Sequence, residues 1–224
     1  LSNGEYKTSI EINKNEIIAR AEFSKSLAFE QEFEKMNDGL NFENEKVKAF
    51  GMKKNSRGLA EILYYEDENH FILKLVPKDS EHEIILFKSY PMTSSTFAFM
   101  IEMVATKINI GKKEKLEEEK SEAEYLSRYE INYGDEISIP KIKFNIEHDY
   151  LNLVNNRFKG KSSDYSIAVA YQKTAFKLDE KGAEVESQSV FAVKSAMPSK
   201  QTRLLRFDKP FLILLKRVEN KNPY

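Results

Sequence analysis

A long strand followed by a hinge, near the C-terminal end, is the feature that most constrains the fold of this chain. The residues Ser166–Leu178 are mostly apolar, aromatic or β-branched, and they predict one long β-strand. The next four residues, Asp179–Gly182, are typical of a turn or hinge. From Ala183 to Lys194 the sequence alternates with a period of two, so this segment can lie in a sheet with one buried and one wet face.

The two faces of the alternating segment differ in character. Small or apolar residues occupy one face: Ala183, Val185, Ser187, Ser189, Phe191 and Val193. The other face begins with polar residues: Glu184, Glu186, Gln188, Val190, Ala192 and Lys194. Because the small residues come first, a crowded core could accept this strand from its hinge end. A loop-like stretch and an apolar strand over Phe207–Leu215 follow, and two ordinary strands joined by an inserted loop would give much the same pattern.

The rest of the chain predicts an α+β fold in which strands outnumber helices. We expect further strands over 17–23, 59–65, 71–76, 84–87 and 137–146, with a hairpin between the third and fourth and an irregularity at Pro140. Apolar residues at helical spacing predict a helix from Phe97 to Ile108 that Gly111 ends. The charged stretch Lys112–Glu124 favours a solvated helix or connector, and Tyr150–Phe158 favours a short helix.

Composition narrows the class of protein. Of the 224 residues, 41% are hydrophobic and 32% are charged, which is typical of a globular chain that can bury a core. The net charge of -1 indicates neither nucleic acid nor an anionic membrane as a partner. The absence of cysteine excludes a disulfide framework, a thiolate zinc site and a cysteine nucleophile.

The sequence contains no motif of a known enzyme site, neither a phosphate-binding loop nor a zinc-protease helix nor a nucleophile elbow. His70 and His82 flank the predicted hairpin and could face each other across it, but zinc takes three or four ligands at defined spacing. We therefore expect no metal, no cofactor and no catalytic residue, and we do not expect an enzyme.

Two segments at a particular spacing carry a resemblance to a known family. Asp179–Glu184 resembles the proximal hinge of the serpins, and Phe207–Leu212 resembles the F-x-x-P-F-L strand that follows the serpin reactive loop. The two are separated by about the length of such a loop. Weaker similarities extend over Asn15–Phe33, Leu59–Phe87 and Ile137–Phe144.

This resemblance implies a serpin-like α+β fold with multi-stranded β-sheets and fewer helices. The N-terminal helical portion of the family has no counterpart here, so residues 1–224 look like the C-terminal portion of a single serpin-like domain. The resemblance places the reactive loop at about 181–203. A separate N-terminal portion of the same protein is then an expected partner.

The resemblance also implies that the protein inhibits a serine protease as a suicide substrate with a metastable fold. The hinge residues carried over are Glu180, Gly182, Ala183, Val185, Ser187 and Ser189. The scissile bond is expected near Ala196–Met197, which suits an elastase-like pocket, or at Lys194–Ser195, which suits a trypsin-like one. The family is usually extracellular, while the lack of glycosylation sequons and cysteines also fits an intracellular setting.

Two other hypotheses stay open. The family's usual histidine at the sheet opening corresponds to Gln172, and Val185, Glu186 and Gln188 stand where small residues are usual. These differences favour a non-inhibitory serpin-like binding or carrier protein whose loop does not insert. The third hypothesis is an unrelated β-rich interaction domain that shares the two segments.

Overall fold

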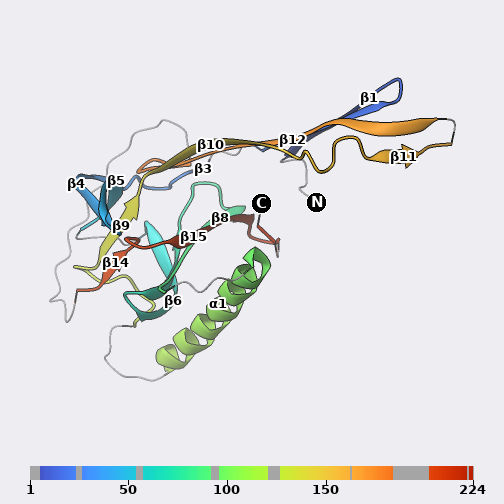
Figure 1. Cartoon of the computed structure of the whole chain (residues 1–224). Coiled ribbons are helices and arrows are strands. Elements are labelled where there is room, and N and C mark those ends of the chain that lie inside the picture. The colour runs from blue at the N-terminus through green and yellow to red at the C-terminus, as the bar shows by residue number, and fades with distance from the viewer. Residues whose placement is uncertain are drawn as a thin grey trace. The chain divides into compact units, whose positions relative to one another are not determined.

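The computed structural model describes residues 6–23, 27–53, 58–91, 96–120, 127–161, 163–183, 202–220 and 222–223 (Figure 1). The chain divides into two compact units. The first unit combines Leu1–Ser26 with Ile142–Lys177, and the second combines Leu27–Lys141 with Leu178–Tyr224. Each unit is thus built from two stretches of chain that are distant in the sequence.

The first unit is a five-stranded sheet in the order β1-β2-β12-β10, in which β11 also pairs with β12. Its strands are β1 (Tyr6–Asn13), β2 (Glu16–Phe23), β10 (Ile142–Asp149), β11 (Arg157–Lys159) and β12 (Asp164–Leu178). The strand predicted from the long apolar pattern is confirmed as β12, and the one predicted over 17–23 is confirmed as β2.

The short helix expected over Tyr150–Phe158 is wrong. A turn covers residues 151–155 and β11 follows it. The backbone of this segment makes short turn bonds and then bonds to β12, because Asn155 N–H donates to the Ile167 carbonyl at 2.8 Å and Ile167 N–H donates to the Asn156 carbonyl at 3.1 Å. Asn155 also has a positive φ of 68°, which a helix does not accept.

Strand alternation places charged pairs on one face of the first unit's sheet and exposed isoleucines on the other, which we call the apolar face and which also carries Gln172. On the charged face Arg20 pairs with Glu11 at 2.5 Å, and Lys173 pairs with Glu147 at 2.7 Å. The apolar face carries a ring contact between Phe144 and Phe176, whose centroids are 5.6 Å apart. Three isoleucines on it are exposed: Ile10, Ile12 and Ile146.

The second unit contains two four-stranded sheets and a short two-stranded one. The order β15-β8-β7-β6 comprises β6 (Ala60–Asp67), β7 (His70–Leu75), β8 (His82–Ser89) and β15 (Phe211–Arg217). The order β14-β9-β5-β4 comprises β4 (Glu34–Phe42), β5 (Glu45–Met52), β9 (Glu136–Pro140) and β14 (Leu204–Arg206). The third sheet pairs β3 (Leu27–Ala28) with β13 (Gly182–Ala183). The predicted hairpin is confirmed as β7 and β8.

Two predicted strands have other bounds in the structure. The strand expected over 137–146 breaks at Lys141, next to Pro140, into β9 and β10. The apolar strand expected from Phe207 to Leu215 starts only at Phe211, since Phe207–Pro210 has no ladder partners. Pro210 has no N–H to donate to a neighbouring strand, which explains the late start.

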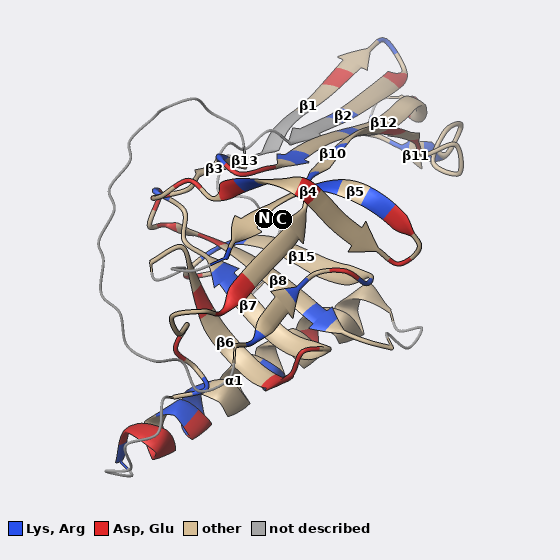
Figure 2. Ribbon diagram, turned by 90° about the vertical axis from the view of Figure 1, so that its left-hand side faces the viewer, with Lys and Arg blue, Asp and Glu red and all other residues tan. Residues whose placement is uncertain are grey.

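The helix α1 (Phe97–Lys120) packs through Ile101, Val104 and Ile108 on a core cluster that includes Ile85 and Leu214 of the sheet. The prediction that Gly111 ends this helix is wrong. Gly111 is buried inside α1, and a Cβ there would lie 2.0 Å from the Leu63 carbonyl oxygen. The glycine therefore allows the helix to approach β6 closely. The charged stretch expected to be helical or connecting is helical as far as Lys120 (Figure 2).

Aromatic side chains organise the core of the second unit. Phe29, Phe33 and Phe50 form one buried cluster, with ring centroids 5.0 to 6.3 Å apart. The fully buried Phe207 ring lies between Phe71 at 5.0 Å and Phe211 at 4.9 Å. Within the described ranges, no helix combines the length and the apolar character that crossing a membrane requires.

Candidate functional site

The chain enters the predicted reactive loop through a tight turn at the end of β12. Asp179 N–H donates to the Gly182 carbonyl at 3.3 Å, and Gly182 N–H donates back to the Asp179 carbonyl at 3.1 Å. The Asp179 carboxylate also accepts a hydrogen bond from Lys181 N–H at 3.0 Å. The sequence predicted a turn or hinge here, and the structure has a reversal after which the short strand β13 pairs with β3.

Gly182 is held tightly against the segment that begins at Leu27. It has a φ of +115°, and a Cβ on it would lie 2.3 Å from the Leu27 carbonyl oxygen. The backbone of the hinge turn also bonds to the segment after β3. Phe29 N–H donates to the Lys181 carbonyl at 3.0 Å, and Phe33 N–H donates to the Glu180 carbonyl at 2.9 Å. The hinge is therefore anchored by its backbone, and only glycine fits at position 182 without strain.

The Glu180 side chain is the charged part of this anchor. It is only 5% exposed, and its carboxylate pairs with Lys35 at 3.4 Å and with Lys141. Burial by itself raises the pKa of Glu180, but the pairing with Lys141, together with Lys35, outweighs burial and holds the pKa below its ordinary value. The folded protein therefore favours an ionised carboxylate at the hinge.

Glu180→Gln is expected to lower the free energy of unfolding by about 1.5–3 kcal/mol at pH 7, because it removes charged hydrogen-bond partners of two lysines. Since the folded pKa is lowered, this stabilisation is complete above the ordinary glutamate pKa of about 4.3 and is lost as pH falls through the folded value. Urea unfolding of both proteins between pH 7 and pH 3 measures it. A difference that grows on acidification would contradict the assignment, and Glu61→Gln, which removes an exposed pair with Lys74, is the control.

A second anchor lies where the chain leaves the predicted loop. The Asp135 carboxylate, fully buried, accepts hydrogen bonds from Arg203 Nε at 3.2 Å, from Arg203 N–H at 3.0 Å and from Asn132 N–H at 2.8 Å. The Arg203 guanidinium also donates to the carbonyls of Arg128, at 2.6 Å, and Glu130. The pair joins the start of β9 to the start of β14, which run parallel from Glu136 and Leu204.

Asp135→Ala is expected to destabilise the protein by about 3–5 kcal/mol, since it leaves a largely buried guanidinium without its anion. The matched control is Glu136→Gln, which removes a more exposed pair with Arg206 and should cost less than about 1 kcal/mol. Urea midpoints at pH 7 compare them. An equal decrease in the free energy of unfolding in the two variants would show that the buried Asp135–Arg203 pair stabilises the fold no more than the more exposed Glu136–Arg206 pair does.

The segment after β14 is fixed by a buried lysine. Lys88 is 3% exposed and donates to the carbonyls of Glu68 at 2.9 Å and Arg206 at 2.8 Å, and to the Asp208 carboxylate at 2.7 Å. These bonds link β8 to the chain between β14 and β15. The part of the chain that follows the predicted loop is therefore locked into the second unit.

The first unit holds the two strands between which a loop would insert. β2 and β12 are direct neighbours and run parallel, in register from Glu16 with Ser166 to Phe23 with Thr174. Gln172 lies in this part of β12, where it accepts a hydrogen bond from the Tyr150 hydroxyl at 2.7 Å and donates to Thr174 at 3.3 Å. An amide can thus make the polar contacts expected of a histidine at this place.

The structure describes some of the predicted site residues and not others. Glu180 and Gly182 come together with the backbone of Ala183 at the loop entrance. The other predicted hinge and reactive-site residues lie outside the described residues: Val185, Ser187, Ser189, Lys194, Ser195, Ala196 and Met197. Sequence reasoning did not find Lys35, a partner of Glu180, or the pair Asp135 and Arg203. The other partner of Glu180, Lys141, lies in Ile137–Phe144, a segment whose similarity to the serpins was already noted.

The suggestion that His70 and His82 face each other is wrong. In the strand ladders His70 lies opposite Ser89, while His82 lies opposite Arg217. Each imidazole instead contacts a nearby carboxylate: His70 contacts Asp67 at 2.9 Å and His82 contacts Asp79 at 2.8 Å. Across the described part of the chain, no three histidine or carboxylate side chains gather closely enough to hold a metal ion.

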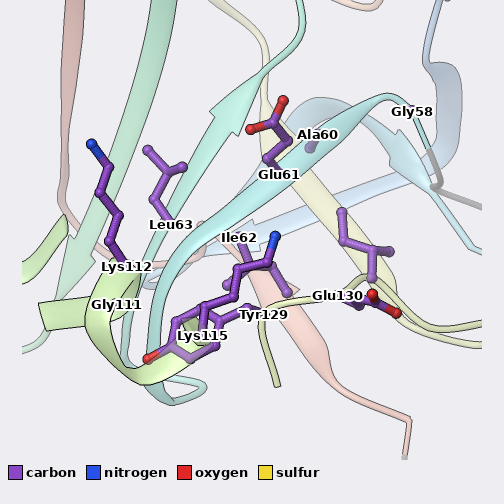
Figure 3. A pocket seen from close by; sticks show the side chains of 11 residues that line it. Gly58, Ala60, Glu61, Ile62, Leu63, Gly111, Lys112, Lys115, Tyr129 and Glu130 are labelled. Carbon is purple, nitrogen blue, oxygen red and sulfur yellow. The ribbon is translucent and has the colours of Figure 1, made fainter. Parts of the chain in front are cut away.

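A surface groove of about 560 Å³ lies between β6, the second half of α1 and the segment around Tyr129 (Figure 3). Ile62, Leu63 and Ile131 are among its apolar lining residues. Lys112 and Lys115 stand at its side on α1 (Figure 3). None of the predicted hinge residues that the structure describes lines it. The groove is therefore separate from the hinge, but it adjoins the second anchor, because Glu130 lines it and accepts a hydrogen bond from Arg203.

No protein-family model and no curated protein sequence matches this chain. Solved structures do. The chain is similar to a serpin from the trematode Schistosoma haematobium, with a TM-score of 0.56 and 14% identity over 92% of this chain and 54% of that one. It is similar to tengpin, a thermophilic serpin in its native state, with a TM-score of 0.54 and 14% identity over 95% of this chain and 55% of that one.

A further similar structure is thyroxine-binding globulin in complex with thyroxine, with a TM-score of 0.52 and 11% identity over 95% of this chain and 56% of that one. The chain spans about half the length of these three proteins. At such identities the likeness shows the fold alone. The chain has a serpin-like α+β fold, mostly β-sheet, as the sequence predicted.

Proposed function

We propose that this chain, which has a serpin-like fold, is the part of a serine protease inhibitor that carries the reactive loop. The protease cleaves the loop and forms its acyl-enzyme. The freed loop then inserts between β2 and β12 as a new strand and carries the protease away from its starting position. Strand addition to a metastable sheet supplies the driving force.

The observation that supports this proposal most is the parallel pairing of β2 and β12 together with the turn at the end of β12. A strand that leaves this turn runs antiparallel to β12. Because β2 is parallel to β12, the same strand also runs antiparallel to β2. An inserted loop would therefore replace one parallel ladder by two antiparallel ladders, which are slightly more stable per residue.

The proposed site residues follow from the predicted alternation. Glu180 and Gly182 are the hinge, and Ala183, Val185, Ser187 and Ser189 face inward after insertion. The scissile bond lies at Ala196–Met197 for an elastase-like protease, or at Lys194–Ser195 for a trypsin-like one. The anchors at Glu180 and at Asp135 support this scheme, because they hold both ends of the loop while its middle is attacked.

Incubation with elastase-like and trypsin-like proteases, followed by a denaturing gel, tests the proposal. A covalent complex is expected, and the mass of the released C-terminal peptide identifies the scissile bond. Cleavage without any complex, by every protease tried, would overturn inhibition. The experiment uses the longest available form of the protein, since this chain spans about half of the similar solved serpins.

The second candidate is a non-inhibitory binding or carrier protein. The bulkier or charged residues Val185, Glu186 and Gln188 in the loop favour it, because they hinder insertion into a crowded sheet. The similarity to thyroxine-binding globulin, a binding protein by name, is compatible with it. Thermal unfolding before and after loop cleavage separates the two, since only an inserting loop raises the melting temperature.

The proposed function also implies which partners the protein has and where it acts. The partners are the target serine protease and a separate N-terminal portion of the same protein. The exposed apolar face of the first unit's sheet supports the second partner, because such a face is normally covered. We place the protein outside the cell, in keeping with the role of an inhibitor of secreted proteases.

A further inference from the structure

The strand β1 forms the edge of the first unit's sheet. It pairs with β2 along its whole length, from Tyr6 with Phe23 to Asn13 with Glu16, without a bulge. No described strand pairs with its outer edge. A continuous edge of eight residues leaves a row of backbone N–H and C=O groups that another strand can bond.

The described side chains of β1 do nothing to protect this edge. Ile10 is 72% exposed and Ile12 is 59% exposed, and both lie on the apolar face, opposite Ala19 and Ile17 of β2. Glu11 points to the other face, where it pairs with Arg20. Natural edge strands are usually blocked by proline, by a bulge or by charged side chains. Along Ser9–Asn13 β1 has no proline and no bulge, and its one charged residue, Glu11, is already paired with Arg20 of β2.

The sequence of β1 is complementary to itself in the antiparallel direction. With Ser9 opposite Ser9 of a second copy, position 7, a lysine, lies opposite position 11, a glutamate, and this pair occurs twice. In the same register Tyr6 lies opposite Ile12 and Thr8 lies opposite Ile10. Opposite charges and aromatic or β-branched pairs are the combinations that stabilise antiparallel strands.

We propose that two copies of this chain associate through their β1 strands, related by a two-fold axis at Ser9. The result is one continuous sheet across both copies, with the apolar faces on the same side. The interface is isologous, so it closes at the dimer and does not propagate. Addition at the edge leaves both faces of the sheet open, so a covering partner on the apolar face is compatible with it.

Single-cysteine variants test this directly, because the chain has no cysteine of its own. Directly opposite residues in an antiparallel pair have Cα atoms about 4.5–5.5 Å apart, which matches disulfide geometry. Under mild oxidation Ser9→Cys is expected to form a disulfide-linked dimer. The control Asn145→Cys, exposed on β10 at the other end of the sheet, is expected to stay monomeric on the same gel.

Sedimentation velocity supplies a measurement without cross-linking. The wild-type chain is expected to sediment as a species of twice its 26.0 kDa mass, and the double variant Ile10→Lys, Ile12→Lys as a monomer. Both side chains are exposed, so the variant should fold. The control Ile146→Lys changes the same apolar face on β10 and should remain dimeric.

Two results would overturn the dimer through β1. A wild-type monomer at tens of micromolar would show that the edge of β1 does not bind a second copy. A dimer that survives the double lysine variant and fails to cross-link through Ser9→Cys would place the contact elsewhere. Neither result bears on protease inhibition, which the gel assay tests separately.

Discussion

Ser187→Arg is expected to abolish inhibition and to turn the protein into an ordinary substrate of its target protease. In the proposed inserted strand Ser187 faces inward, so the variant would bury a guanidinium with no carboxylate to pair with. Burying an unpaired charge costs several kcal/mol, which is enough to stop insertion while the protease completes hydrolysis. The denaturing gel should show cleaved protein and no covalent complex.

The matched control is Gln188→Arg, one residue further along. The alternation places Gln188 on the face that stays in water after insertion, so this variant is expected to keep the covalent complex. Both variants are expected to unfold within about 0.5 kcal/mol of the wild type, because the proposed scheme keeps the loop out of the sheet until it is cleaved. If Ser187→Arg inhibits as well as Gln188→Arg does, insertion with this register is wrong.

Gly182→Ala is expected to lower the free energy of unfolding by about 2–4 kcal/mol. An alanine at this position would have to hold a φ of +115°, which costs about 1–3 kcal/mol by itself. Its Cβ would in addition lie 2.3 Å from the Leu27 oxygen and 2.8 Å from the Ala28 Cα. All of these contacts are with backbone atoms, so no side chain can rotate away to relieve them.

The control for this prediction is Gly58→Ala. Gly58 also has a positive φ, of +83°, but no atom of the described residues lies within 4 Å of a Cβ built there. It should therefore show the conformational cost without the clash, a loss of about 1 kcal/mol. Urea unfolding measures the free energy of unfolding of both variants, provided that the dependence of this free energy on urea concentration is the same in each. Equal losses would show that the contact between the hinge and β3 is unimportant for stability.

Much of the fold could be predicted from the sequence because its signals are local. The period-two and apolar patterns of β6, β7, β8 and β12 are legible within one strand each. The hinge was predictable for the same reason, since Asp179 and Gly182 are neighbours in the chain. The strands β1, β3, β4, β5, β11 and β14 were missed. β4 has only one buried residue, Leu40, so its sequence contains almost no apolar period.

The sequence by itself determined the strands with a clear apolar pattern, such as β7, β8 and β12, and the turn after β12, because propensity and side-chain alternation act over a few residues. Only the tertiary structure decided that β2 runs parallel to β12, that Glu180 meets Lys35 and Lys141, and that Asp135 holds Arg203 from 68 residues away. It also decided that α1 runs on through Gly111, where the close carbonyl of Leu63 requires a glycine. Such pairs depend on how distant segments pack together, and no local pattern encodes a partner that the chain meets only after folding.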